Sequence, residues 1–215
     1  MRATQPRGAR RWGSRLACVA LVAALFAAPP MLGDDRYQED AVKAAFLYRF
    51  TGYVDWPRDA LERPSFTLAV LHSDAVAAEL ARLLPRHTIK NLPAQVRTVR
   101  SAKEAADAQL LYVGSDYTGD LADVVESLAT RPVLVVTDRP DALNSGSAIN
   151  FLLVDERVRF EISMPAVVRS RLWVQPPLLA VAARVRGIPR SDDGRAVPVS
   201  PSRPHEPRPV ALARS

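Results

Sequence analysis

The stretch FTLAVL, residues 66–71, is an almost unbroken apolar run of six residues. This length and composition are typical of a β-strand that is buried on both faces. Similar runs recur at 110–113 (LLYV) and 133–136 (VLVV), with a weaker one at 95–100, and helix-like segments at 74–84, 101–106 and 120–129 lie between them. Strands that alternate with helices predict a mainly parallel sheet covered on both faces.

The pattern changes after residue 147. Residues 148–154 and 157–163 are two strand-like runs separated only by Asp155 and Glu156, which predicts an antiparallel β-hairpin. In the second arm the alternation predicts that one set of side chains faces the core and the other faces away; the first is Val158, Phe160 and Ile162, and the second is Arg157, Arg159, Glu161 and Ser163. Short helices are expected from Pro165 and from Pro176. The predicted fold class is therefore α/β, with a mixed, mainly parallel sheet flanked by helices and a C-terminal antiparallel β-hairpin.

A helix is expected before the first strand. Apolar residues recur there with helical spacing, at Val42, Phe46, Phe50 and Tyr53, and Gly52 and Trp56-Pro57 mark the end. We interpret these four side chains as a stripe that faces the core.

The first 33 residues are typical of an export signal. A basic run to Arg15 precedes the apolar stretch 16–28 and then Pro29-Pro30, and the stretch is short for a membrane-spanning helix. The sequence does not distinguish among three cleavage positions, after Ala24, Ala28 or Gly33, and the segment could also be retained as an uncleaved anchor. We predict a signal peptide over 1–33, a domain over 34–187, a disordered Pro/Arg-rich tail over 188–215, a periplasmic location and no stable membrane insertion after cleavage. The single cysteine, Cys18, lies in the signal, so no disulfide is expected in the mature protein.

The net charge of +6 suggests a nucleic-acid partner until the charges are located. Both ends of the chain are basic, whereas residues 34–187 contain 19 of the 29 basic and 20 of the 23 acidic residues. The domain is close to neutral, so we expect it not to bind nucleic acid.

No motif in the chain carries recognisable chemistry. His72-Ser73-Asp74 are consecutive, which does not suit a catalytic triad, and Gly114-Ser115-Asp116 is explained by turn preferences. Asp138 and Asp141 follow a strand, where ligands of open α/β sheets bind, but turn or capping roles explain them as well. We therefore predict no enzyme activity, no catalytic, cofactor-binding or metal-binding residues, and no cofactor.

Two segments carry a resemblance to a known family. VKAAFLYRF at 42–50, followed by VDWP at 54–57, is similar to the N-terminal signature of the YfiR family, a domain of unknown function; SGSAINF at 145–151 and VRFEIS at 158–163 are similar to its C-terminal hairpin. The resemblance spans roughly residues 41–183. It implies a periplasmic α/β protein, usually a homodimer, that holds an inner-membrane diguanylate cyclase inactive in its best-known member.

The expected function is that of an exported regulatory binding protein that represses an inner-membrane signalling protein such as a diguanylate cyclase, and so acts on cyclic di-GMP, biofilm and adhesion. The alternatives are a periplasmic small-ligand carrier or sensor and a hydrolase with an unrecognised site. Arg157 and Arg159 on the hairpin and Trp173 are the candidate partner-binding residues, because Arg and Trp are enriched in binding hot spots. A solvated sheet face and a buried tryptophan are the competing interpretation of the same residues.

Overall fold

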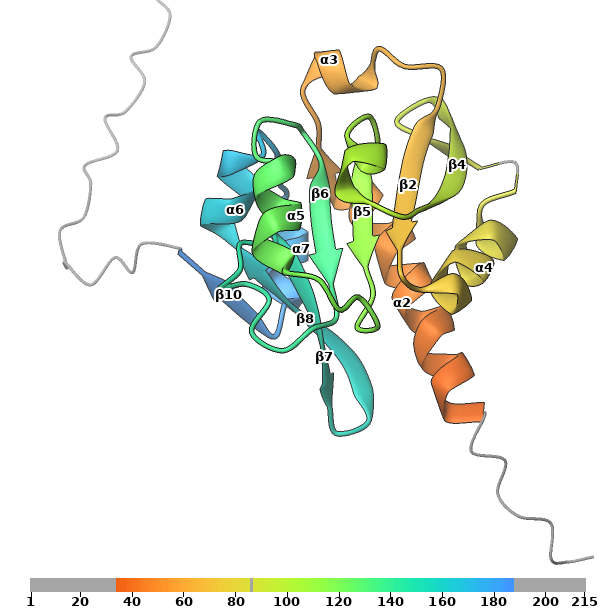
Figure 1. Ribbon diagram of the computed structural model, residues 1–215, viewed down its shortest axis with the longest axis vertical. Helices are drawn as coiled ribbons and strands as arrows, with labels where there is room; N and C mark the ends of the chain where they lie inside the picture. Colours follow the sequence, from red (N-terminus) through yellow and green to blue (C-terminus); the bar gives the residue numbers. More distant parts are fainter. Residues whose placement is uncertain (1–33, 86, 188–215) are drawn as a thin grey trace, which may run out of the picture.

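The computed structural model describes residues 34–85 and 87–187 of the chain (Figure 1). The predicted signal peptide (1–33) and tail (188–215) lie outside the described residues. An eight-stranded sheet has the strand order β10-β8-β7-β6-β5-β2-β4-β3, and β1 and β9 form a separate two-stranded sheet. The strands are β1 (Val54–Asp55), β2 (Phe66–Leu71), β3 (Thr88–Ile89), β4 (Leu92–Val99), β5 (Leu110–Val113), β6 (Leu134–Thr137), β7 (Ile149–Val154), β8 (Arg157–Ser163), β9 (Trp173–Val174) and β10 (Arg184–Arg186).

The predicted fold class is confirmed. Strands β4, β2, β5, β6 and β7 are parallel, and β8 pairs with β7 as the antiparallel arm of the hairpin. The strands β2, β5 and β6 are buried at every position, as their apolar runs predict. Strand β10, which the sequence analysis did not anticipate, adds to β8 in parallel.

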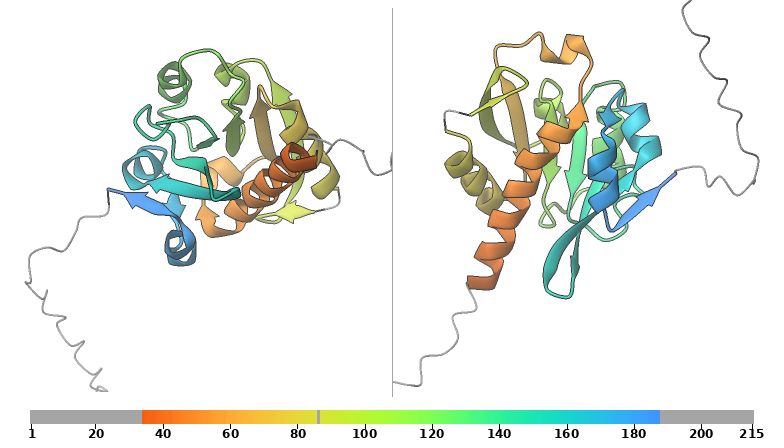
Figure 2. Two further views of the ribbon diagram at one scale, coloured as in Figure 1. Left: turned by 90° about the horizontal axis from the view of Figure 1, so that it is seen from below. Right: turned by 180° about the vertical axis from the view of Figure 1, so that it is seen from behind.

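Helices cover both faces of the sheet (Figure 2). The long helix α2 (Asp34–Tyr53) and α4 (Asp74–Leu83) pack together on one face, and the 3-10 helix η1 (Ala102–Ala105) and α5 (Leu121–Ser127) cover the other. Three further short helices are α3 (Arg58–Leu61), α6 (Met164–Arg169) and α7 (Pro176–Val181). No helix in the described part of the chain combines the length and apolar character needed to cross a membrane.

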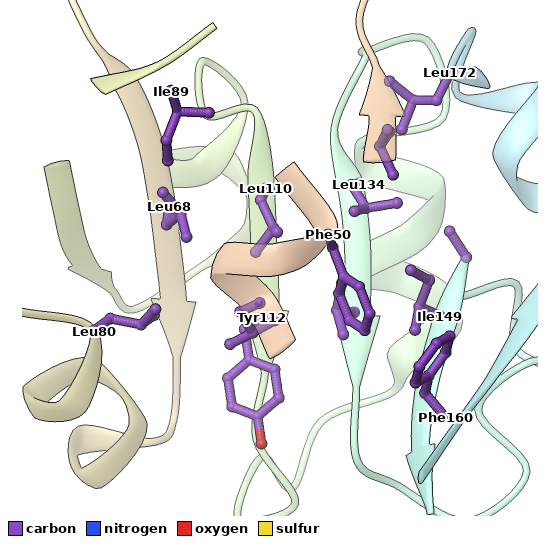
Figure 3. Packing of buried hydrophobic residues seen from close by; sticks show 14 of the residues in the cluster. Phe50, Leu68, Leu80, Ile89, Leu110, Tyr112, Leu134, Ile149, Phe160 and Leu172 are labelled. Carbon is purple, nitrogen blue, oxygen red and sulfur yellow. The ribbon is translucent and has the colours of Figure 1, made fainter. Parts of the chain in front are cut away.

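The core-facing stripe of α2 differs from the prediction. Phe50 is fully buried, but Val42 and Tyr53 are 41% and 39% exposed and Phe46 is only partly buried. The buried arc of the helix instead includes Ala44 and Leu47, which keep the helical spacing but are rotated from the predicted stripe. The rings of Phe46 and Phe50 both pack against the ring of Phe160, at centroid distances of 5.6 and 5.0 Å, so α2 is fixed against the hairpin. Figure 3 shows Phe50 and Phe160 in this part of the core.

A two-residue turn joins the arms of the hairpin. Val154 pairs with Arg157, and the intervening Asp155 and Glu156 both have left-handed backbone angles, with φ of 48° and 58°. Two such residues form the turn type that matches the twist of paired strands, which explains how a loop without glycine closes this hairpin. Its tip projects beyond the end of the sheet, beside the first turns of α2 (Figures 1 and 2).

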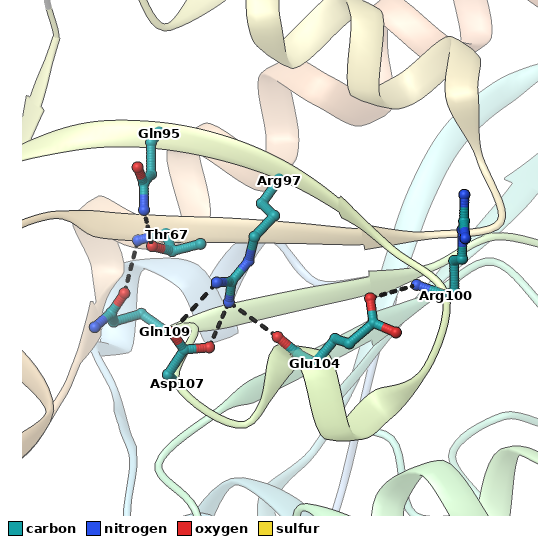
Figure 4. Close-up of polar contacts among 7 residues, drawn as sticks. All are labelled: Thr67, Gln95, Arg97, Arg100, Glu104, Asp107 and Gln109. Carbon is teal, nitrogen blue, oxygen red and sulfur yellow. Dashed lines mark hydrogen bonds and ion pairs between the residues drawn. The ribbon is translucent and has the colours of Figure 1, made fainter.

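Polar contacts hold the opposite end of the sheet (Figure 4). The Gln109 side chain accepts a 2.7 Å hydrogen bond from the Thr67 amide, and Arg97 on β4 forms an ion pair with Asp107. The predicted short helix after β4 is the 3-10 helix η1, in which Glu104 accepts a 3.1 Å hydrogen bond from the Arg100 amide, while the Ser101 side chain caps no backbone amide. These contacts anchor β2 and β4, on the side of the sheet that lies away from the hairpin.

Candidate functional site

The predicted partner-binding residues occupy two separate places. Arg157 and Arg159 are exposed on β8, and neither forms an ion pair among the described residues. Trp173 is 65% exposed on β9, where it pairs with Asp55 at the far end of α2. The two arginines therefore lie together on the hairpin, whereas the tryptophan lies on a strand of the other, two-stranded sheet, beside the residues that follow α2.

A groove of about 730 Å³ lies between the start of α2 and the hairpin, and we call it the hairpin groove. Its apolar lining is Val42, Phe46, Leu153 and Val158, and its polar lining is Gln38, Glu39, Glu156 and Arg157. Leu153 is 62% exposed and the neighbouring Val154 is 44% exposed, although both are large aliphatic residues in a strand. An exposed apolar patch that is surrounded by charged residues is typical of interaction surfaces.

A second, smaller space adjoins the groove. This inner cavity of about 150 Å³ shares Glu39, Leu153 and Val158 with the groove and is lined as well by Lys43, Ser115, Asp138, Phe151 and Leu152. Asp138 directly follows strand β6, so the inner cavity lies at the carboxyl ends of the parallel strands. Open α/β sheets bind their ligands at this edge.

Lys43 of α2 forms a buried ion pair in the inner cavity. Its ammonium lies 2.5 Å from Asp138 Oδ2 and 2.7 Å from Glu39 Oε1, and the side chains of Lys43 and Asp138 are 9% and 8% exposed. Burial alone would lower the pKa of Lys43, but the hydrogen bonds to Asp138 and Glu39 and their charges outweigh it, so the pKa is raised. The lysine therefore stays protonated inside the domain.

Tyr112 adds a hydroxyl to this cluster. The residue is fully buried on β5, and its hydroxyl points toward the carboxyl end of the strand (Figure 3). Burial, and then the negative charge and hydrogen bonding of Asp138, raise the pKa of Tyr112 far above its ordinary value. It therefore stays neutral beside the carboxylate.

Glu161 is buried, which corrects the prediction that it points away from the protein. It is 3% exposed and accepts a 3.2 Å hydrogen bond from Asn150, which in turn accepts one of 2.8 Å from Thr137. Arg184 and Arg186 of β10 lie 3.5 and 4.0 Å from its other oxygen. Ser163, also predicted to face away, is 8% exposed. Strand β10 pairs edge to edge with β8 and places its arginines beside Glu161, where they compensate the buried charge.

The two turns without assigned chemistry come together in space. Gly114 donates a 2.9 Å hydrogen bond to the Leu71 carbonyl, and a Cβ at position 114 would lie 2.3 Å from the His72 carbonyl oxygen. The His72 ring packs near Tyr117, 5.4 Å between centroids. Close approach of the two turns, more than turn preference alone, explains the glycine.

Sequence reasoning missed Lys43, Tyr112 and Glu161. Lys43 stands on the apolar side of a helix, and Glu161 interrupts an apolar strand, so a charged residue inside a hydrophobic pattern was the available signal. Asp138 was singled out at the correct strand end, but nothing in the sequence paired it with a lysine 95 residues earlier.

Together the fold and the groove define an α/β domain in which the start of a helix and the tip of a hairpin form the two walls of one groove. The model of the YfiR/HmsC-like family matches residues 40–183, about two thirds of the chain, and the chain belongs to this family. The resemblance noted in the sequence is thereby confirmed. The family is one of regulatory, non-enzymatic domains and supports a periplasmic regulatory role in general.

Proposed function

We propose that this protein is a periplasmic regulator that binds an inner-membrane signalling protein, such as a diguanylate cyclase, and holds it inactive. Family membership supports the regulatory class. The observation that carries the binding role is the exposure of Val42, Leu153 and Val154, which gather where α2 meets the hairpin. Leaving large aliphatic side chains in water gains nothing for folding, so a partner that covers them accounts for their position.

The charges at this face indicate the chemistry of the partner. Arg157 lines the hairpin groove and Arg159 lies next to it on the strand. A partner segment with aliphatic side chains for the groove and a carboxylate for these arginines would complement both features. The exposed Trp173 lies elsewhere on the domain, so a contact there would need a second surface of the partner or a second copy of the chain.

The first experiment measures cellular cyclic di-GMP after deletion of the gene, alone and together with deletion of any membrane diguanylate cyclase that is encoded beside it. A rise that disappears in the double deletion is the expected result. An unchanged level in both strains would contradict repression of a cyclase and would direct the search to another envelope partner by cross-linking.

Variants then locate the contact. Leu153→Asp should fail to restore repression, because a charge in the groove opposes burial of an apolar partner surface. Val181→Asp is the matched control, since Val181 is 61% exposed on α7 and does not line the groove. A double substitution of Arg159 and Trp173 that folds normally and regulates normally would remove these two residues from the contact.

A further inference from the structure

Three arginines from separate segments of the chain line one cavity at the amino ends of the parallel strands. We call this space, of about 240 Å³, the arginine cavity. Arg63 lies before β2, Arg131 lies before β6, and Arg171 lies before β9. The other polar side chains of its lining are Asp59, Asp107, Gln109 and Thr130. The arginine cavity shares no residue with the hairpin groove, so it is a separate site of the domain.

The two carboxylates of the arginine cavity already have partners. Asp59 accepts a 3.0 Å hydrogen bond from Arg171. Asp107 forms an ion pair with Arg97, which reaches it from β4 (Figure 4). The two other arginines that line the cavity form no ion pair among the residues that the structure describes. Two guanidinium groups are thus left at this cavity without a carboxylate of the described chain.

The positive charge of the cavity acts on Asp107. The hydrogen bond from Arg97 lowers the pKa of Asp107 below its ordinary value of 3.8, and the charges of Arg97 and Arg63 lower it further. The carboxylate therefore stays ionised at neutral pH. Even so, the three lining arginines and Arg97 outnumber the two carboxylates, which leaves a net charge of +2. Like charges that are held close together repel, and an anion bound among them would remove that repulsion.

The type and placement of the donors indicate the class of anion. A guanidinium carries its N–H donors in a planar fork that matches the oxygens of a phosphate or a carboxylate. Because the three arginines come from three different segments, a tetrahedral phosphate offers oxygens to more of them than a planar carboxylate does. The volume of the cavity is below the roughly 300–1,000 Å³ of sites for drug-sized ligands, so the ligand must be small. A cation would meet the excess of positive charge.

We propose that the arginine cavity binds the phosphate group of a small phosphate ester. Arg63 and Arg131 donate to the phosphate oxygens, and Arg171 donates to them beside its bond to Asp59. The same group occurs in soluble esters and in the headgroup of phosphatidic acid, and the experiment below separates these two sources. This inference names a site and a ligand class beyond the proposed repression of a membrane protein. It is measured on the purified protein alone, so its failure and the failure of the regulatory proposal are distinguishable.

The test is isothermal titration calorimetry of the purified protein, at constant ionic strength, with three molecules of one skeleton. These are glycerol 3-phosphate, glycerate and glycerol, which carry a phosphate, a carboxylate and no charge. We expect saturable binding of glycerol 3-phosphate, at least about tenfold weaker binding of glycerate and none of glycerol. In parallel, the protein is sedimented with phosphatidylcholine vesicles that contain or lack phosphatidic acid. Binding that is confined to vesicles with phosphatidic acid would support the lipid source, whereas binding of neither phosphate form, or equal binding of glycerate, would overturn the proposal.

Variants assign the binding to this cavity. Arg63→Gln and Arg131→Gln should each weaken binding of the phosphate form by about tenfold, and the double variant should abolish it. Both positions are exposed, so the variants should fold, and their melting temperatures check this. Arg49→Gln is the matched control, since Arg49 is an exposed arginine of α2 that does not line the cavity, and it should bind as the wild type does. Unchanged binding in the double variant, or an equal loss in Arg49→Gln, would refute the site.

Discussion

Replacing Lys43 by methionine should lower the free energy of unfolding by about 3–5 kcal/mol at neutral pH. Methionine keeps the length and the apolar stem of lysine but removes the ammonium that pairs with Asp138 at 2.5 Å. Asp138, 8% exposed, would then hold a buried charge without its partner, whereas Glu39, 32% exposed, can turn to water. A loss of this size corresponds to a melting temperature lower by roughly 10 °C for a domain of this length.

Urea unfolding followed by the fluorescence of Trp56, which is 7% exposed in the core, measures the loss. The matched control is Lys103→Met on the exposed side of η1, which should change stability by less than about 0.5 kcal/mol. The double variant Lys43→Met with Asp138→Leu should recover most of the loss, because it leaves no unpaired charge. A loss below about 1 kcal/mol for Lys43→Met, or no recovery in the double variant, would refute the buried ion pair as described.

Three further predictions concern the same framework. The pKa values of Lys43 and Tyr112 are both raised above their ordinary 10.5 and 10.0. The stability that these two groups contribute should therefore be present at neutral pH and lost as the pH rises above about 10. In urea titrations between about pH 9 and about pH 11, the free energy of unfolding should fall less for Tyr112→Phe than for the wild type. Gly114→Ala should destabilise the protein by about 1–3 kcal/mol or more, because the new Cβ would clash with the His72 carbonyl. Gly52→Ala on α2 should instead stabilise it by up to about 1 kcal/mol, because a Cβ there has nothing within 4 Å. Equal changes in melting temperature for the two variants would contradict this. Asn150→Leu should cost about 2–3 kcal/mol, because it leaves Thr137 and Glu161 without their hydrogen bonds; a loss below about 0.5 kcal/mol in the same denaturant assay would contradict this.

The parallel part of the sheet could be predicted from the sequence because its strands are buried on both faces. Residues 66–71 and 110–113 are apolar at nearly every position, and no helix period competes with that pattern. The hairpin was equally visible, since only two residues separate two strand-like runs. Strands of this kind, short apolar runs bounded by turns, can be predicted from neighbouring residues in the sequence alone.

The predictions of side-chain burial were wrong where burial depends on contacts between residues far apart in the sequence. Glu161 alternates with core residues and is therefore predicted to face the solvent, but β10, a short Arg-Val-Arg strand without a strand-like pattern, pairs with β8 and brings Arg184 next to it. On α2, the presence of Lys43 in the buried arc depends on Asp138, which no local pattern reveals. Charged residues inside apolar patterns therefore mark the polar clusters of this protein better than its short motifs do.

The binding face at α2 and the hairpin is tested most directly by photo-cross-linking in the periplasm. A photoreactive phenylalanine analogue at Leu153, an exposed position on the hairpin, is compared with the same analogue at Glu126, an exposed position on α5 across the sheet. We expect a discrete adduct with an inner-membrane signalling protein from position 153 and none from position 126. The same adduct from both positions, or an adduct from position 126 alone, would contradict it.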